Sequence, residues 1–205
     1  MAEIKFYTNP RSRGRMIRWM LEEVGADYDP VYLEYGSMNG EEYRHINPMA
    51  KVPAIAHGAN IVTECAAICA WLADSFPDAG LAPPLDRRAD YYRWLFFSAG
   101  PLESAITNQA LGVELQSEQK GFVGYGDMSR VLGTLEMAVG RHAFIAGNEF
   151  TAADVYLGAQ LNFGLQFGTI EKRKAFEDYV ARVTDRDAFR KAAALDDAAI
   201  ADDGG

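Results

Sequence analysis

The sequence contains few cysteines and no long apolar run. Its 205 residues include only 2 cysteines, Cys65 and Cys69, which lie in a helical pattern. Their spacing suits reduced thiols better than a disulfide framework and favours a cytoplasmic protein. No stretch of about 18 apolar residues is present, so we expect no transmembrane helix. The first residues lead directly into a strand pattern, so we also expect no signal peptide.

Positive charge is scarce as well. The 20 Lys and Arg residues are outnumbered by 29 Asp and Glu, which gives a net charge of −9. Such a chain binds nucleic acid and anionic membranes poorly, so neither is expected as a partner. The 3 histidines are scattered without metal-ligand spacing, so no metal site is expected. Basic residues nevertheless gather where a strand pattern gives way to a helix, at Arg11, Arg13, Arg15 and Arg18.

The first 77 residues carry the pattern of a mixed α/β domain. Alternating apolar residues predict short strands, and apolar residues at helical spacing predict two helices. In chain order, the predicted elements are a strand over residues 4–8, a helix over 16–24, strands over 29–35, 54–57 and 60–63, and a helix over 64–75. The order βαβ followed by ββα predicts a small, mixed four-stranded sheet.

An all-α domain is expected to follow, because proline and glycine cluster at residues 76–84 as they do between modules. We predict a first domain over residues 1–77, a linker over 78–86, a helical domain over 87–195 and a flexible acidic tail over 196–205. The expected helices lie over residues 87–115, with strain near Gly100-Pro101, and over 127–142, 151–165, 172–183 and 188–195. Thr151 and Asp154 have the spacing of a capping box, which we interpret as structural.

The segment NPMAKVPAI, residues 47–55, places a proline directly before a strand. Pro53 has no N–H for a sheet ladder, so it belongs at the first residue of the strand or at an edge. With a cis Val52–Pro53 bond, the main-chain N–H and C=O of Val52 face outward, where an extended peptide can pair with them. The alternative interpretation is a simple turn proline.

The segment VTECAAI, residues 62–68, marks a helix start. Such a start presents N–H groups and a partial positive charge, which attract a carboxylate, and Glu64 can accept from an ammonium group. Together they would hold both charged groups of an amino-acid head. In the alternative interpretation, Thr63 is the N-cap and Glu64 is a first-turn acid that favours the helix dipole.

Five segments in this order resemble the cytosolic-type glutathione S-transferases of bacteria. They are FYTNPRSRGRMIRWMLEEVGADYD, NPMAKVPAI, VTECAAICAWLAD, FIAGNEFTAADVYLG and FEDYVARVTDRDAFRKAAALD. The resemblance covers nearly the whole chain. It implies a thioredoxin-like N-terminal domain that binds glutathione, an all-α domain that lines the electrophile site, and a cytoplasmic homodimer.

The resemblance also implies which residues hold glutathione. By this resemblance, Val52 pairs with the peptide backbone of glutathione. Its neighbours Lys51 and cis-Pro53 also belong to the implied binding residues. Glu64 and Cys65 hold the γ-glutamyl end. The family usually has serine where this chain has Cys65, and the main-chain N–H serves in either case.

One side chain must activate the thiol, because glutathione reacts as its thiolate and a thiol has a pKa of about 8.5. A hydroxyl that donates to the sulfur favours the thiolate. The family uses Tyr, Ser or Cys after the first strand. Ser12, at the start of the first helix, is our first candidate, and Tyr7, at the strand end, is the second. No cysteine occurs in this loop, so a mixed-disulfide mechanism is not expected there.

The arginine cluster divides into two pairs. Arg11 and Arg13 flank Ser12, and we predict that they attract the anionic ligand. Arg15 and Arg18 are expected to be ordinary helix-surface or interface charges. In the alternative interpretation, some of these arginines pair only with surface acids such as Glu22 or Glu23.

Conjugation of the glutathione thiolate to hydrophobic electrophiles, as in detoxification, is the function that the resemblance implies. One alternative is a glutathione-dependent isomerase, lyase or peroxidase, and another is a non-catalytic binding or regulatory relative. Cys65 is a further open point: a thiol at a helix start can have a lowered pKa, although a small buried apolar role is favoured.

Overall fold

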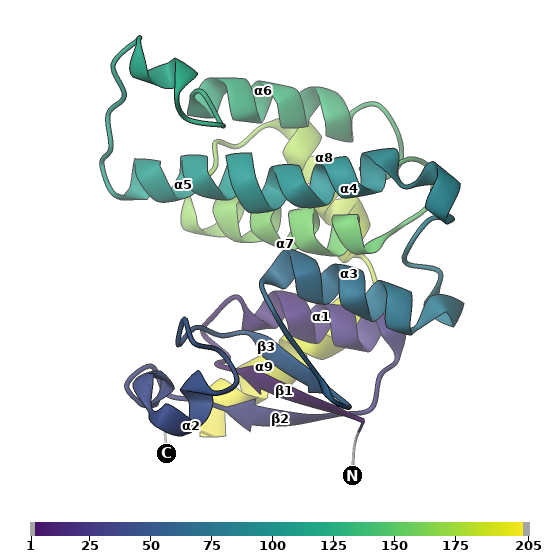
Figure 1. The fold of residues 1–205 in the computed structure, drawn as a ribbon. Coiled ribbons are helices and arrows are strands. Elements are labelled where there is room, and N and C mark those ends of the chain that lie inside the picture. Colours follow the sequence, from purple (N-terminus) through teal and green to yellow (C-terminus); the bar gives the residue numbers. More distant parts are fainter. Residues whose placement is uncertain (1–2, 203–205) are drawn as a thin grey trace. The chain divides into compact units, whose positions relative to one another are not determined.

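The computed structural model describes residues 3–202, which fall into two compact units (Figure 1). The first consists of the described residues up to Leu81 together with those from Asp185 onward, and the second is Ala82–Thr184. The first boundary falls inside the predicted linker. The prediction that one helical domain continues to residue 195 is wrong, because the last helix belongs to the first unit. None of the helices in residues 3–202 is long and apolar enough to cross a membrane.

The first unit is built on a mixed four-stranded sheet with strand order β2-β1-β3-β4. β1 pairs in parallel with β2 and antiparallel with β3, which pairs antiparallel with β4. The predicted fold class is therefore confirmed. The elements of this unit are β1 (Ile4–Thr8), α1 (Gly14–Val24), β2 (Tyr28–Tyr32), α2 (Glu41–Arg44), β3 (Ala54–His57), β4 (Asn60–Thr63), α3 (Cys65–Ser75) and α9 (Asp187–Asp202).

Sequence periodicity explains how these elements bury one face. The alternation in β1 buries Ile4 and Phe6 completely. Apolar residues at helical spacing bury one side of α1, including Ile17 and Met20. The helix ends at Gly25, whose φ of 66° is the left-handed conformation that glycine adopts easily at a helix C-terminus. α1 packs on α3 and on α9.

The C-terminal segment is helical rather than a flexible tail. Residues 196–202 belong to α9, and Asp196 is fully buried. Along the contact of α9 with α1, the ring of Phe189 meets that of Trp19 edge to face, with centroids 4.9 Å apart. Alanine favours a helix here, and packing on α1 supplies the stabilisation that an isolated helix lacks. The rest of the predicted tail, residues 203–205, lies outside the described residues.

The second unit is helical, as predicted. Its helices are α4 (Ala89–Phe97), α5 (Glu103–Ala110), α6 (Met128–Val139), α7 (Ala152–Phe167) and α8 (Lys174–Thr184). The helix predicted over residues 87–115 is interrupted by a π-helical turn at Ser98–Leu102, which contains Pro101. Proline removes an N–H donor and crowds the preceding turn, so a local change in helical winding is expected at this position.

A buried carboxylate organises the start of α7. Asp154 Oδ2 accepts a hydrogen bond from the main-chain N–H of Thr151 at 2.9 Å, the reach-back bond of the predicted capping box. Its Oδ1 accepts from the N–H of Ile145 at 2.8 Å and from the hydroxyl of Tyr179 at 2.7 Å. Burial raises the pKa of the Asp154 carboxyl, although these hydrogen bonds oppose the shift. These contacts tie α7 to α8 and to the preceding loop, in agreement with a structural role.

Candidate functional site

The strand register brings the candidate residues to one end of the sheet. Tyr7 of β1 is the register partner of Ala54 in β3, and Ala54 is the partner of Thr63 in β4. β1 ends one residue after Tyr7, β3 begins at Ala54 and β4 ends at Thr63. The β1–α1 turn, the Val52–Pro53 segment and the start of α3 therefore follow one another along this end, which we call the sheet end.

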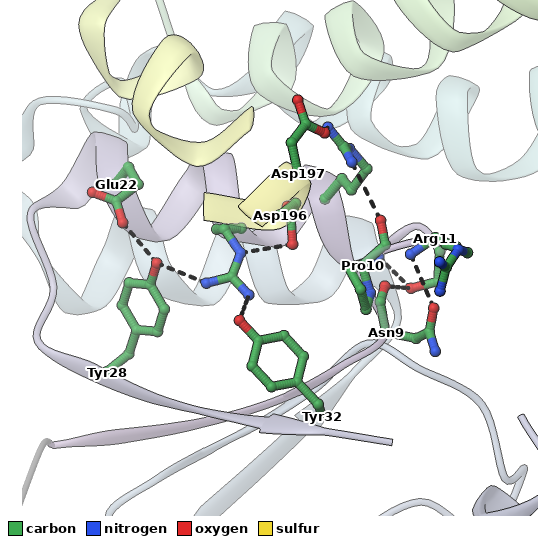
Figure 2. A network of polar contacts seen from close by, with 12 residues as sticks. Asn9, Pro10, Arg11, Glu22, Tyr28, Tyr32, Asp196 and Asp197 are labelled. Atoms are coloured by element: carbon green, nitrogen blue, oxygen red, sulfur yellow. Dashed lines mark hydrogen bonds and ion pairs between the residues drawn. The ribbon is translucent and has the colours of Figure 1, made fainter. Parts of the chain in front are cut away.

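The turn from β1 to α1 is organised by Asn9, which is buried (Figure 2). Its amide donates to the C=O of Leu33 at 3.0 Å, and its Oδ1 accepts from the N–H of Arg11 at 2.9 Å. The Ser12 hydroxyl donates to the C=O of Asn9 at 2.7 Å and accepts from the N–H of Gly14 at 2.9 Å. Ser12 is thus half-buried at the start of α1, with its hydroxyl held by the turn.

The second candidate, Tyr7, lies on the sheet face away from α1. The neighbouring Phe6 ring faces α1, because the guanidinium carbon of Arg18 lies 5.3 Å from its centroid. Successive side chains of a strand point to opposite faces, so Tyr7 points away from α1. Its ring packs against Tyr43 of α2, with centroids 5.7 Å apart. Of the two candidates, Ser12 is the one placed at the start of α1.

The loop before β3 is held by two buried side chains. The C=O of Lys51 accepts hydrogen bonds from Tyr43 Oη at 2.6 Å and from Asn47 Nδ2 at 2.8 Å. Burial raises the pKa of Tyr43 to about 12, so its hydroxyl remains a donor at neutral pH. The Val52–Pro53 peptide bond is cis. Within residues 3–202, no hydrogen bond reaches the main-chain N–H or C=O of Val52.

Two asparagines fix these loops, and neither was among the predicted site residues. Asn9 and Asn47 are both buried, and each is followed by a proline. In both, Oδ1 accepts from the main-chain N–H two residues later, and the amide nitrogen donates to a carbonyl that steadies the turn. Asn-Pro is a recognised turn signal, so this pattern was available in the sequence.

Ala50 adopts a conformation that normally suits glycine. Its φ is 53°, and the left-handed region costs a residue with a β-carbon roughly 1–2 kcal/mol. Glycine removes this strain but makes the unfolded chain freer, which costs roughly 0.5–1 kcal/mol. We therefore expect Ala50→Gly to stabilise the protein by about 0.5–1 kcal/mol, seen as a higher urea midpoint of unfolding. Ala67→Gly, at an exposed position of α3, is the matched control and should lower the midpoint. An unchanged midpoint for Ala50→Gly would contradict the strain argument.

Glu64 precedes α3 in a strained conformation. Its φ of 66° and ψ of 120° lie outside the regions that non-glycine residues favour, and such a residue costs on the order of 1–3 kcal/mol. The side chain is exposed and makes no capping bond to α3. The alternative in which Thr63 caps the helix is wrong, because α3 begins at Cys65 and Glu64 is itself the N-cap residue. Strain of this kind is typical of functional positions.

The two cysteines and His57 occupy positions that indicate structural roles. Cys65 and Cys69 are both reduced and buried, and burial raises the pKa of the Cys69 thiol. His57 Nδ1 accepts from the indole N–H of Trp71 at 3.2 Å, so Nε2 carries the proton and donates to Glu3 at 2.8 Å. Among the described residues, no group of three or more His, Cys, Asp or Glu side chains is placed to hold a metal ion.

Arg18 is buried beneath α9. Its Nε donates to Asp196 Oδ1 at 2.8 Å, and its two terminal nitrogens donate to the hydroxyls of Tyr28 and Tyr32 at 3.2 and 3.1 Å (Figure 2). The guanidinium also lies over the Phe6 ring. Asp196 Oδ2 has no partner among the described residues, and burial raises the pKa of this carboxyl against the opposing effect of Arg18.

Arg15 also reaches α9. It pairs with Asp197 at 2.7 Å, and its second terminal nitrogen donates to the C=O of Pro10 at 3.4 Å (Figure 2). Both arginines therefore pair with acids of α9, and Arg18 is buried rather than a helix-surface charge. The acids of α1 are paired with basic residues of the C-terminal segment, as in the 2.6 Å contact of Glu22 with Lys191.

Comparisons with known proteins show a similarity to glutathione S-transferases. Residues 12–75 match the family model described as glutathione S-transferase, N-terminal domain. The chain is 28% identical to glutathione S-transferase hmp2 of Hypomyces subiculosus over 93% of this chain and 98% of that protein. It is 29% identical to glutathione S-transferase GstA of Escherichia coli O157:H7 over 75% and 79%, respectively. A sphingomonad glutathione S-transferase solved in complex with glutathione matches with a TM-score of 0.76 at 26% identity, over 94% of this chain and 98% of that one.

The likeness extends beyond the matched N-terminal domain. The sphingomonad structure covers nearly the whole of this chain, including the helices of the second unit. The order of the sheet and of its helices agrees with the thioredoxin-like N-terminal domain of that family. Residues 12–75 therefore match the N-terminal domain of glutathione S-transferases, and the chain is similar to members of that family over nearly its whole length.

Proposed function

We propose that this protein binds glutathione at the sheet end and conjugates its thiolate to hydrophobic electrophiles. The observation that carries the proposal is the unpaired main chain of Val52, on the same sheet end as the first turn of α1 and the start of α3. An extended peptide that lies beside Val52 can exchange main-chain hydrogen bonds with it, as an added strand does. Glutathione is a short peptide, and it is the ligand of the sphingomonad relative.

The charged groups of glutathione suit the surroundings of Val52. The first turn of α3, which begins at Cys65, offers N–H groups and the positive end of a helix dipole to the γ-glutamyl carboxylate. Glu64, whose side chain is exposed at the same place, accepts from the ammonium group. The exposed cations Lys51, Arg11 and Arg13 attract an anionic ligand to a protein whose overall charge is −9.

Ser12 is the residue that stabilises the thiolate in this proposal. Rotation of its O–H away from Asn9 leaves the Asn9 carbonyl with the hydrogen bond from the Ser12 N–H at 3.0 Å. The hydroxyl can therefore turn to the glutathione sulfur while the turn keeps its shape. One hydrogen bond to a charged acceptor contributes roughly 1.5–3 kcal/mol, which lowers the thiol pKa by about 1–2 units. The thiolate then forms a bond to the electrophilic carbon as the leaving group departs.

Ser12→Ala is expected to raise the pKa of the bound thiol and to lower kcat/KM for 1-chloro-2,4-dinitrobenzene about 10- to 100-fold at neutral pH. The thiol pKa is read from the ultraviolet absorbance of the thiolate as a function of pH. Tyr7→Phe is the matched control, because it removes one hydroxyl from the face away from α1, and it should change kcat/KM by less than about twofold. Loss of turnover in Tyr7→Phe alone would reverse the roles given to the two residues.

Calorimetric titration with S-methylglutathione separates binding from chemistry, since this ligand lacks the reactive thiol. We expect it to bind the wild type and Ser12→Ala alike. A wild type that binds neither glutathione nor S-methylglutathione would refute the site. A wild type that binds both but turns over no member of a panel of electrophiles would instead make the protein a non-catalytic member of its family.

A further inference from the structure

A buried hydroxyl without a partner lies beside Ser12. Thr8, the last residue of β1, is fully buried, and its Oγ1 has no hydrogen-bond partner among the described residues. Its main chain is paired, because the C=O of Thr8 accepts from the N–H of Leu33 at 2.9 Å. The side-chain hydroxyl alone is unsatisfied. Most buried polar groups of native proteins have partners, so an exception of this kind requires a reason.

Gly14 defines where this hydroxyl lies. A β-carbon added to Gly14 would overlap Thr8 Oγ1 and would lie 3.0 Å from Ser12 Oγ. The two hydroxyl oxygens therefore border the same small space next to the Cα atom of Gly14. Glycine keeps this space open, and its N–H donates to Ser12 Oγ at 2.9 Å.

Ser12 Oγ has an acceptor position that the turn does not use. A hydroxyl oxygen carries two lone pairs, and the N–H of Gly14 occupies one of them. The hydroxyl proton of Ser12 is directed to the C=O of Asn9 at 2.7 Å. If that proton turns to a thiolate, the Ser12 oxygen becomes a stronger acceptor, because hydrogen bonds in a chain polarise one another. Thr8 Oγ1–H is the unpartnered buried donor next to it.

We infer that Thr8 is a positioning residue for thiolate formation: its hydroxyl donates to Ser12 Oγ while Ser12 Oγ–H donates to the glutathione sulfur. This inference rests on the proposed function. The added donor holds the Ser12 hydroxyl in the orientation that faces the sulfur and strengthens it as a donor. Thr8 is β-branched, so its χ1 angle is restricted and its hydroxyl has few alternative positions next to Gly14. Valine would fill the same volume without a buried polar atom, so an idle hydroxyl here would only destabilise the fold.

Thr8→Val tests the inference, because it keeps the side-chain shape and removes the donor. We expect the pKa of the bound glutathione thiol to rise by about 0.5–1 unit. Below that pKa, kcat/KM should fall about 3- to 10-fold, with a smaller loss at higher pH. The urea midpoint of unfolding should stay the same or increase. Thr8→Ser keeps the hydroxyl and should retain the wild-type thiol pKa. S-methylglutathione should bind Thr8→Val and the wild type equally.

A wild-type thiol pKa in Thr8→Val would overturn the inference, because the hydroxyl would then be idle. The inference also fails if Thr8→Val raises the pKa further when added to Ser12→Ala, since Thr8 would then act by a route other than Ser12. A wild type that binds glutathione without lowering its thiol pKa would refute the proposed activation itself, which is a distinct result. If Thr8→Val does not fold, Thr8→Ala and Thr8→Ser are compared instead. The pKa of the bound glutathione thiol should then be higher in Thr8→Ala than in Thr8→Ser.

Discussion

Asp196→Ala is expected to lower the free energy of unfolding by about 3–5 kcal/mol, because it leaves a buried guanidinium without its counter-ion. The side chains of Arg18 and Asp196 are only 2% and 1% exposed, and their contact at 2.8 Å ties α1 to α9. The hydroxyl of Tyr28 stays within reach of Arg18 but carries no charge to replace the carboxylate. Urea unfolding followed by tryptophan fluorescence measures the loss, and Trp19 reports on this contact because it packs against Phe189 of α9.

Asp197→Ala is the matched control for this change. Asp197 is the next residue of α9 and also pairs with an arginine of α1, but its side chain is 67% exposed. Exposed pairs typically contribute about 0–1 kcal/mol, so this variant should be nearly as stable as the wild type. The double variant with Arg18→Met and Asp196→Leu should recover much of the stability, because apolar residues of similar volume need no counter-ion. Equal losses for Asp196→Ala and Asp197→Ala would contradict the argument from burial.

Asp154→Ala should cost a similar amount in the second unit, about 3–5 kcal/mol. The carboxylate accepts from two main-chain N–H groups and from the hydroxyl of Tyr179, all of them buried. Alanine removes the acceptor of all these donors at once, and each buried donor left unpaired costs roughly 1–3 kcal/mol. Urea unfolding measures the effect, and the fluorescence of Trp94, the tryptophan of this unit, reports on it.

Asp127→Ala provides the comparison for Asp154→Ala. Asp127 caps α6 by accepting from the N–H of Arg130 at 2.9 Å, but its side chain is 32% exposed. Loss of a cap at such an exposed position should cost clearly less than loss of the buried Asp154 carboxylate. The difference between the two variants therefore isolates the buried network around Asp154. If the two losses were equal, Asp154 would be an ordinary cap, and the contacts to Tyr179 and Ile145 would contribute little.

The local elements of this protein were largely predictable from its sequence. The alternation over residues 4–8, the helical spacing that ends at Gly25 and the turn between residues 57 and 60 each involve neighbours in the chain. Short-range sterics and one-sided burial decide such patterns, so the sequence predicts them well. The break at Gly100-Pro101 and the reach-back bond of Asp154 are of the same kind. Helix ends were predicted less well: α5 stops at Ala110 rather than at residue 115, although Gly112, with a φ of 68°, is a C-terminal signal in the sequence.

The candidate site was predictable in its location but less so in its geometry. Motifs placed Ser12, Val52 and Glu64 in separate loops, and the strand register brought these loops to one sheet end. That Ser12 donates to Asn9, and that Thr8 has no partner, depends on how α1 lies against the end of β1. Side-chain directions at that level come from packing, which residue spacing does not encode.

By itself, the sequence determined that an α/β domain is followed by a helical one. It also determined the order of the elements and the loops that carry the candidate site. Only the tertiary structure decided that α9 joins the first unit and that Arg18 is buried against Asp196, 178 residues away. The reason is physical: periodicity, caps and turns act over a few residues. A buried ion pair instead requires two distant segments to exclude water around both partners, and composition alone had indicated a solvated acidic tail.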